Sequence, residues 1–226
     1  MTPVLWPCPL QAGGTVDELA LTFDDFRRWR LLIVPALFDE GNKLRRFTVE
    51  VMRRLHGAGV DSILIDLPGC NESLQLLEAQ TPALWREGVQ SAAKHFRASH
   101  VLGIRGGCLL VPDDLPGWRY APATGAQLLR QLMRSRIVAS REAGRAETVD
   151  GLTAQGLAYG LELAGHRLGA EFLRQFQSLA PVEAPDAAKI DQNTLGGGGL
   201  WLRAEPDEDR VQADALAALI AIGIKA

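Results

Sequence analysis

The first residues that could do chemistry surround an arginine at a sharp bend. The apolar run His100–Ile104 continues into Gly103-Ile-Arg-Gly-Gly107, which predicts a strand that turns abruptly toward a helix. Arg105 takes the central position of this bend. A guanidinium stays protonated and cannot attack a carbonyl carbon, but it can hold an anion through paired hydrogen bonds. The pattern therefore predicts a charged site and not a nucleophile.

Arg105 has three interpretations. The first is an internal ion pair, because a buried arginine without a partner would cost several kcal/mol. The candidate partners are Glu40, Asp66 and Glu205. The second is an anion site in which Arg105, the amides of Gly106 and Gly107 and the positive end of the following helix converge on a carboxylate, phosphate or sulfate. In the third, the bend lies elsewhere in the chain.

Other side chains with catalytic potential are scattered. Cys70 and Ser73 follow a predicted strand and would lie at the rim of a cleft, while His166 is the only histidine after the bend. His166 could act as a base toward either of them, although a histidine in an apolar helix is more often a packing residue. Cys108 is expected to be a small buried residue.

Two more charged residues are ambiguous from sequence alone. Asp66 at the end of a strand could orient a ligand or could cap the turn that follows it. Lys43 could contact a ligand or could belong to a solvated helix face together with Arg45 and Arg46. The tetraglycine at 196–199 lacks the Lys and Ser/Thr of a phosphate loop and indicates a flexible turn.

The elements that must position these residues alternate between strand and helix. Apolar runs predict buried strands at 31–34, 60–65, 100–104 and 118–121, and a final strand near 200–203. Helical spacing is present from Asn42 to Leu55, from Trp85 to Phe96, over 125–145 and over about 155–179. A closing helix is expected to begin at Asp207 or Glu208 and to pack through three residues. These are Val211, Leu216 and Leu219. The order predicts an α/β fold with a mostly parallel sheet.

Composition excludes several classes of function. The 226 residues carry a net charge of −3, which does not favour a nucleic-acid partner. The three cysteines have no zinc or disulfide spacing, so no metal or cofactor is expected. No apolar stretch approaches the length of a membrane span, and the N-terminus lacks the pattern of a leader; we expect a cytoplasmic protein of one domain covering 1–226.

Four blocks of sequence resemble the α/β-hydrolase superfamily and, within it, the exosortase A system-associated hydrolases (type 2) that accompany exopolysaccharide systems. The blocks are VPALFDEGNKLRRF, LIDLPGCNES, LGIRGG and QLLRQLMRSRIVAS. The resemblance implies a mostly parallel sheet of about eight strands with flanking helices, and a cleft at the carboxyl ends of the strands. It also implies an oxyanion-hole loop at 35–43. The two helices within about 124–180 would form a small helical cap inserted before the last strands.

The resemblance does not carry over a catalytic triad. Acyl transfer in this superfamily needs a serine, an acid and a histidine in that chain order. Arg105 stands at the nucleophile position, and no histidine follows His166. The chain is therefore expected to have the fold without its usual chemistry.

Three functional hypotheses follow. The protein could bind a small anionic or acyl-type ligand in the cleft, using a set of residues around the bend. That set is Arg105, Gly106, Gly107, Lys43, Asp66 and Glu40. It could instead be a hydrolase or acyltransferase whose relocated residues are Cys70 or Ser73 with His166. It could also be an interaction module for a protein partner or a second copy, with the arginine-rich stretch 125–145 as its surface.

Overall fold

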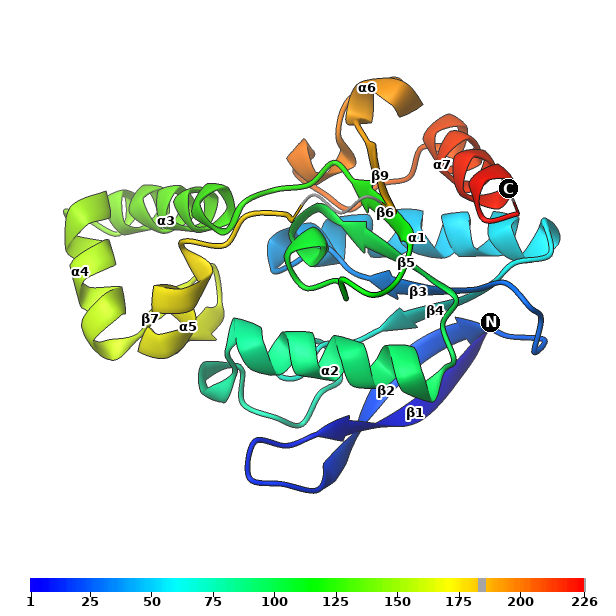
Figure 1. Cartoon of the computed structure of the whole chain (residues 1–226). Helices are drawn as coiled ribbons and strands as arrows, with labels where there is room; N and C mark the ends of the chain where they lie inside the picture. The colour runs from blue at the N-terminus through cyan, green and yellow to red at the C-terminus, as the bar shows by residue number, and fades with distance from the viewer. Residues whose placement is uncertain (183–185, 226) are drawn as a thin grey trace.

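A seven-stranded sheet forms the centre of the molecule (Figure 1). The computed structural model describes residues 1–182 and 186–225. The strands, in spatial order, are β1 (Thr2–Pro9), β2 (Thr15–Phe23), β4 (Asp61–Ile65), β3 (Arg30–Val34), β5 (His100–Ile104), β6 (Gly117–Tyr120) and β9 (Ala187–Ile190). The pairs β1–β2 and β2–β4 are antiparallel, and the other four neighbouring pairs are parallel. The predicted mostly parallel α/β sheet is confirmed.

Helices cover both faces of this sheet. They are α1 (Asp39–Gly57), α2 (Pro82–His95), α3 (Gly125–Glu142), α4 (Val149–Tyr159), α5 (Ala170–Phe176), α6 (Gln192–Leu195) and α7 (Arg210–Gly223). Three 3-10 helices are η1 (Leu77–Ala79), η2 (Arg105–Leu109) and η3 (Leu200–Leu202). Helices α1 and α7 pack on one face and α2 on the other, each over its own buried apolar cluster (Figure 1). No helix among the described residues is both long and apolar enough to cross a bilayer.

The sequence pattern identified the central strands but not the first two. Strands β3, β4 and β5 are apolar runs buried on both faces, which is how a strand inside a parallel sheet reads. Strand β1 contains Pro3, Pro7 and Pro9, and prolines are more typical of loops than of strands. These prolines share one parity, so their missing N–H groups all lie on the open edge of the sheet, where no ladder bond is lost. They also make this edge a poor template for pairing with another chain.

The expected final strand near 200–203 is wrong. Residues 200–202 form the 3-10 helix η3, and the described sheet ends at β9. Leu200 and Trp201 are buried in the apolar cluster under α1 and α7, so the apolar run that predicted a strand is explained by packing of this short helix. The sheet accordingly has one strand fewer than the resemblance implied.

The expected helix over 155–179 is also wrong. Helix α4 ends at Tyr159 and is capped by Gly160, whose φ is 81°. A two-stranded hairpin of β7 (Leu161–Leu163) and β8 (His166–Leu168) separates it from α5. The leucines at 157, 161 and 168 matched helical spacing by coincidence. His166 therefore lies on a strand, where successive side chains point to opposite faces, and not on a helix, where the side-chain repeat is 3.6 residues.

The closing helix α7 begins at Arg210, with Asp209 as its N-cap accepting from the amide of Gln212. Its buried stripe is Ala213, Leu216, Ala217 and Ile220. The expected contact through Leu216 is correct. Val211 is 72% exposed and Leu219 is 39% exposed, so these two expectations are wrong, because both residues lie outside the stripe that the helical period selects.

Candidate functional site

Arg105 lies at the sharp bend that follows β5, as predicted. Its φ is +52°, a left-handed conformation that costs energy in a residue with a Cβ. The bend packs tightly on the neighbouring strand, since a Cβ on Gly107 would lie 2.4 Å from the carbonyl oxygens of Val34 and Pro35. Only the short η2 follows, so the expected helix whose positive end would face an anion is absent from this position.

The Arg105 guanidinium makes three hydrogen bonds within the protein. Its Nε and Nη2 donate to the two carboxylate oxygens of Glu40, both at 3.0 Å, and its Nη1 donates to the carbonyl oxygen of Ala121 at 2.8 Å. The guanidinium carbon also lies 4.1 Å from the ring centre of Trp201. Glu40 is 2% exposed, so the pair is shielded from water. Of the three interpretations of Arg105, this geometry matches the internal ion pair.

Trp201 has a position that the sequence did not suggest. The resemblance implied a histidine after the last strand, within reach of the nucleophile. Instead η3 places an indole against Arg105, where the positive charge is attracted to the face of the ring. The bend is thus occupied by a stacked and paired arginine.

The other expected binding residues do not converge on Arg105. Asp66 is buried, and its Oδ1 accepts from Arg45 at 2.8 Å and from Asn71 at 2.7 Å. Lys43 pairs with Asp39 at 2.7 Å. Gly106 and Gly107 are buried, which leaves their amides no open space for a ligand. Glu205 is exposed. Among the candidates, only Glu40 contacts Arg105 directly.

The relocated nucleophile and base are not assembled either. Ser73 Oγ donates to Glu18 Oε1 at 2.7 Å and accepts from the amide of Gly69 at 2.8 Å. His166 makes an edge contact with Phe38, with 5.4 Å between ring centres, and burial lowers its pKa. No hydrogen bond in the described part of the chain joins His166 to a serine or cysteine.

The cysteine thiols are held in their protonated form. Burial, together with the charges of Asp66 and Glu18, raises the pKa of Cys70 to about 12. Burial also raises the pKa of Cys8 and of Cys108 to about 12. Cys108 is 2% exposed, in agreement with the expected packing role.

Thiol alkylation should therefore be slow in the folded protein. At pH 8, Cys70 is expected to react with iodoacetamide at least about 100-fold more slowly than after unfolding in guanidinium, because only the thiolate reacts. Mass spectrometry of the labelled peptides measures this for each thiol separately. Rapid labelling of Cys70 in the native protein would instead identify an activated thiol.

One cluster has the ligand types of a metal site. Asp25, His56 and Asp61 each offer an atom within 4.8 Å of the others. The guanidinium of Arg27 lies among them, 2.6 Å from Asp25 Oδ2 and 3.7 Å from Asp61 Oδ1, and it donates to the carbonyl oxygen of His56 at 2.8 Å. Because this cation already neutralises the carboxylates, the cluster is better explained as an ion-pair network than as a metal site.

A cavity of about 320 Å³ lies beside the bend. It is formed by the β3–α1 connection, the first half of α1, the end of β4 with the segment that follows it, and His166 of β8. Its apolar lining includes Leu37, Phe38, Leu44 and Leu67, and its polar lining includes Asn42, Arg45, Cys70, Asn71 and His166. Sequence analysis identified Cys70 and His166 but missed Asn42 and Asn71. The two similarity blocks that contain them were the available signal.

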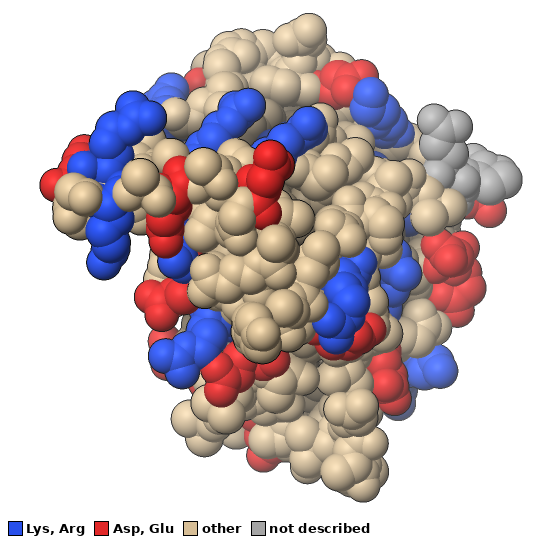
Figure 2. All heavy atoms as spheres, turned by 90° about the vertical axis from the view of Figure 1, so that its left-hand side faces the viewer, with Lys and Arg blue, Asp and Glu red and all other residues tan. Residues whose placement is uncertain are grey.

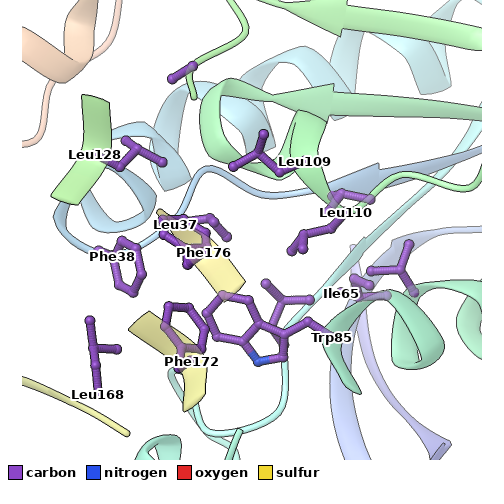
Figure 3. Packing of buried hydrophobic residues seen from close by; sticks show 14 of the residues in the cluster. Leu37, Phe38, Ile65, Trp85, Leu109, Leu110, Leu128, Leu168, Phe172 and Phe176 are labelled. Atoms are coloured by element: carbon purple, nitrogen blue, oxygen red, sulfur yellow. The ribbon is translucent and has the colours of Figure 1, made fainter. Parts of the chain in front are cut away.

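Phe38, which lines this cavity, belongs to a cluster of aromatic side chains. Figure 3 shows Phe38, Trp85, Phe172 and Phe176 turned toward one another. Phe38 lies 6.1 Å from Phe172 and 5.7 Å from Phe176 between ring centres, and Trp85 lies 5.0 Å from Phe172. Phe38 has a φ of 58°, so the loop that carries it is held in a strained shape by these contacts. The segment 125–176 is thereby fastened to the sheet beside the cavity.

The arginine-rich helix α3 has one basic side. Arg130, Arg134 and Arg141 are exposed, and their spacing places them on one face of the helix. Figure 2, which turns the α3–α5 side toward the viewer, shows basic side chains along its upper part. Arg136 differs, since it pairs with Glu147 at 2.7 Å.

Comparison with solved structures defines the class of fold. The chain is similar to alpha/beta hydrolase domain-containing protein 10 from mouse, with 13% identity, 92% of this chain and 94% of that chain covered, and a TM-score of 0.59. It is similar to Est1E from Butyrivibrio proteoclasticus, solved with ferulic acid bound, with 14% identity, coverage of 92% and 93%, and a TM-score of 0.55. It is also similar to the esterase domain of a Rhodothermus marinus protein, with 10% identity, coverage of 100% and 99%, and a TM-score of 0.54.

These similarities extend over nearly the whole of each chain. No protein-family model matches the sequence, and no curated protein matches it. At such identities the likeness concerns the fold alone. The protein therefore has the α/β-hydrolase fold.

Proposed function

We propose that this protein is a non-catalytic α/β-hydrolase-fold protein that binds a small anionic or acyl ligand in the cavity beside the bend. The proposal rests on the contrast between the bend, which is filled, and the cavity next to it, which is open. The bend is filled by Arg105, which Glu40 and Trp201 hold in position. The adjacent cavity of about 320 Å³ is open and lined by both apolar and polar groups.

The lining suits a ligand with an apolar part and a charged head. Leu37, Phe38 and Leu67 provide the apolar wall. Arg45 gives one terminal nitrogen to Asp66, while its Nε and second terminal nitrogen make no hydrogen bond with described residues. A bound carboxylate or phosphate could accept from both, because a guanidinium presents its donors as a fork. We therefore infer that Arg45, and not Arg105, binds the anionic group of the ligand.

The resemblance to exosortase-associated hydrolases supports a proposal about the cellular system in which the protein acts. Most of the cavity lining comes from VPALFDEGNKLRRF and LIDLPGCNES, the two blocks on which that similarity chiefly rests. We infer that what this chain shares with that branch is the shape of a binding cavity. A cytoplasmic role beside an exosortase or exopolysaccharide system, with the segment 125–176 as a cap over the cavity, belongs to the same proposal.

Octanoate is a suitable first probe for the cavity. Titration calorimetry should detect its binding to the wild-type protein, with 1-octanol as the uncharged comparison. Arg45→Met is expected to weaken octanoate binding at least about tenfold, because a charge-assisted hydrogen bond is lost. Arg46→Met is the matched control on the same helix, since Arg46 is exposed and pairs with Glu208. Asn42→Trp, which adds bulk at the mouth of the cavity, should also reduce binding.

Two results would contradict this proposal. Equal losses in Arg45→Met and Arg46→Met would show that octanoate binds elsewhere. The wild type could also hydrolyse p-nitrophenyl butyrate. If Ser73→Ala or His166→Ala abolished that activity, the protein would be an enzyme with relocated catalytic residues.

A further inference from the structure

A second arginine is buried without the partner that Arg105 has. Arg119 lies on β6 and is 4% exposed. Its neighbours Trp118 and Tyr120 belong to the apolar cluster under α1 and α7. Because side chains alternate along a strand, Arg119 points to the opposite, α2 side of the sheet.

The contacts of Arg119 do not compensate its charge. No carboxylate lies within ion-pair distance of it among residues 1–182 and 186–225. Its one hydrogen bond to the described residues is from Nη1 to the carbonyl oxygen of adjacent Trp118, at a long 3.4 Å. Its Nε is buried and has no acceptor. Burial lowers the pKa of this guanidinium, but an arginine still keeps its proton.

This guanidinium borders a cavity of about 350 Å³ on the α2 side of the sheet. Cys108 and Leu109 at the end of η2 also line the cavity. Arg86 of α2 also lines the cavity, and its Nε donates to the carbonyl oxygen of Leu109 at 2.9 Å. Glu87 and Asp113 are exposed acidic residues at the mouth.

We propose that this cavity is a binding site for a small oxyanion, a phosphate or the phosphate group of an ester, held by Arg119 with help from Arg86. An oxyanion accepts several hydrogen bonds at once and would supply the charge that the buried Arg119 lacks. The site lies across the sheet from the Arg105–Trp201 contact, and it does not share lining residues with the cavity beside Phe38. It is therefore independent of the function proposed above.

Inorganic phosphate is the probe, with sulfate and acetate as comparisons. Phosphate at millimolar concentrations should raise the Tm of the wild-type protein and shift the NMR signal of the Arg119 Nε–H group. Arg119→Met is expected to weaken phosphate binding at least about tenfold, and Arg86→Met to weaken it several-fold. Arg130→Met is the control, because Arg130 is exposed on α3 and is not among the residues that line the site.

Acidic variants separate this proposal from an internal counterion. Asp113→Asn and Glu87→Gln should tighten phosphate binding, since each removes a negative charge from the mouth. Glu183→Gln tests the acidic residue that follows Val182 in the sequence. If any of these three variants destabilises the protein while phosphate has no effect on the wild type, the chain supplies its own counterion and the proposal is wrong. Equal phosphate effects on the wild type and on Arg119→Met would also overturn it.

Discussion

Glu40→Ala is expected to lower the free energy of unfolding by about 3–5 kcal/mol, because it leaves the Arg105 guanidinium, only 15% exposed, without its carboxylate. Both oxygens of Glu40 accept from this guanidinium, and Glu40 itself is 2% exposed, so water cannot easily take its place. The remaining contacts, to the carbonyl of Ala121 and the ring of Trp201, do not neutralise the charge. Urea unfolding monitored by tryptophan fluorescence and circular dichroism measures the change.

A double-mutant cycle shows whether the charge or the volume is responsible. Arg105→Met alone should also destabilise, since it leaves Glu40 as the buried charge. Arg105→Met with Glu40→Leu is expected to recover most of the loss, because an apolar pair of similar volume avoids the desolvation cost altogether. Additive losses in the double variant would mean that the two side chains are not coupled as the geometry requires.

The same pair predicts that Arg105→Ser would not make the protein a hydrolase. Arg105→Ser would place a hydroxyl on the strained bend, but η3 presents Trp201 there, and no imidazole contacts the position among the described residues. A serine without a base is a weak nucleophile. The variant would also carry the cost of an unpaired Glu40.

Trp85→Ala should have an effect of similar size for a different reason. Trp85 is a fully buried residue of α2. Its ring centre lies 5.0 Å from that of Phe172 on α5, and its Nε1 donates to the carbonyl oxygen of Pro68 at 2.9 Å. Truncation leaves a cavity and an unsatisfied carbonyl, for an expected loss of about 3–5 kcal/mol. It should also loosen the attachment of the segment 125–176, which hydrogen exchange of the α5 amides can detect.

Two variants make this result interpretable. Trp85→Phe keeps an aromatic ring but removes the hydrogen bond, so it should cost clearly less than Trp85→Ala. Tyr159→Ala, at a residue 88% exposed, should change stability by no more than about 0.5 kcal/mol. If Trp85→Ala had no greater effect than Tyr159→Ala, the aromatic cluster would not be the connection between the sheet and α5.

The sequence by itself determined the parallel centre of the fold. Strands β3, β4 and β5 are continuous apolar runs, and the helices between them have a clear apolar stripe, so local pattern and burial agree. It also determined that the bend holds an arginine, and that this arginine would need a carboxylate if it were buried. Glu40 was among the partners that the charge argument selected.

Only the tertiary structure decided which carboxylate pairs with Arg105 and which residues line the cavity. The choice of Glu40 over Asp66 depends on where the loop after β3 brings α1, and Asp66 is taken by Arg45 and Asn71 instead. The hairpin β7–β8 replaced a predicted helix because turns at Gly160 and Gly165 override the helical spacing of leucines. The burial of Arg119 was not predicted from the sequence, because one arginine in a short strand resembles a surface residue. Only the packing of β6 between two neighbours reveals that its charge is buried, because burial depends on what the rest of the chain places around a residue.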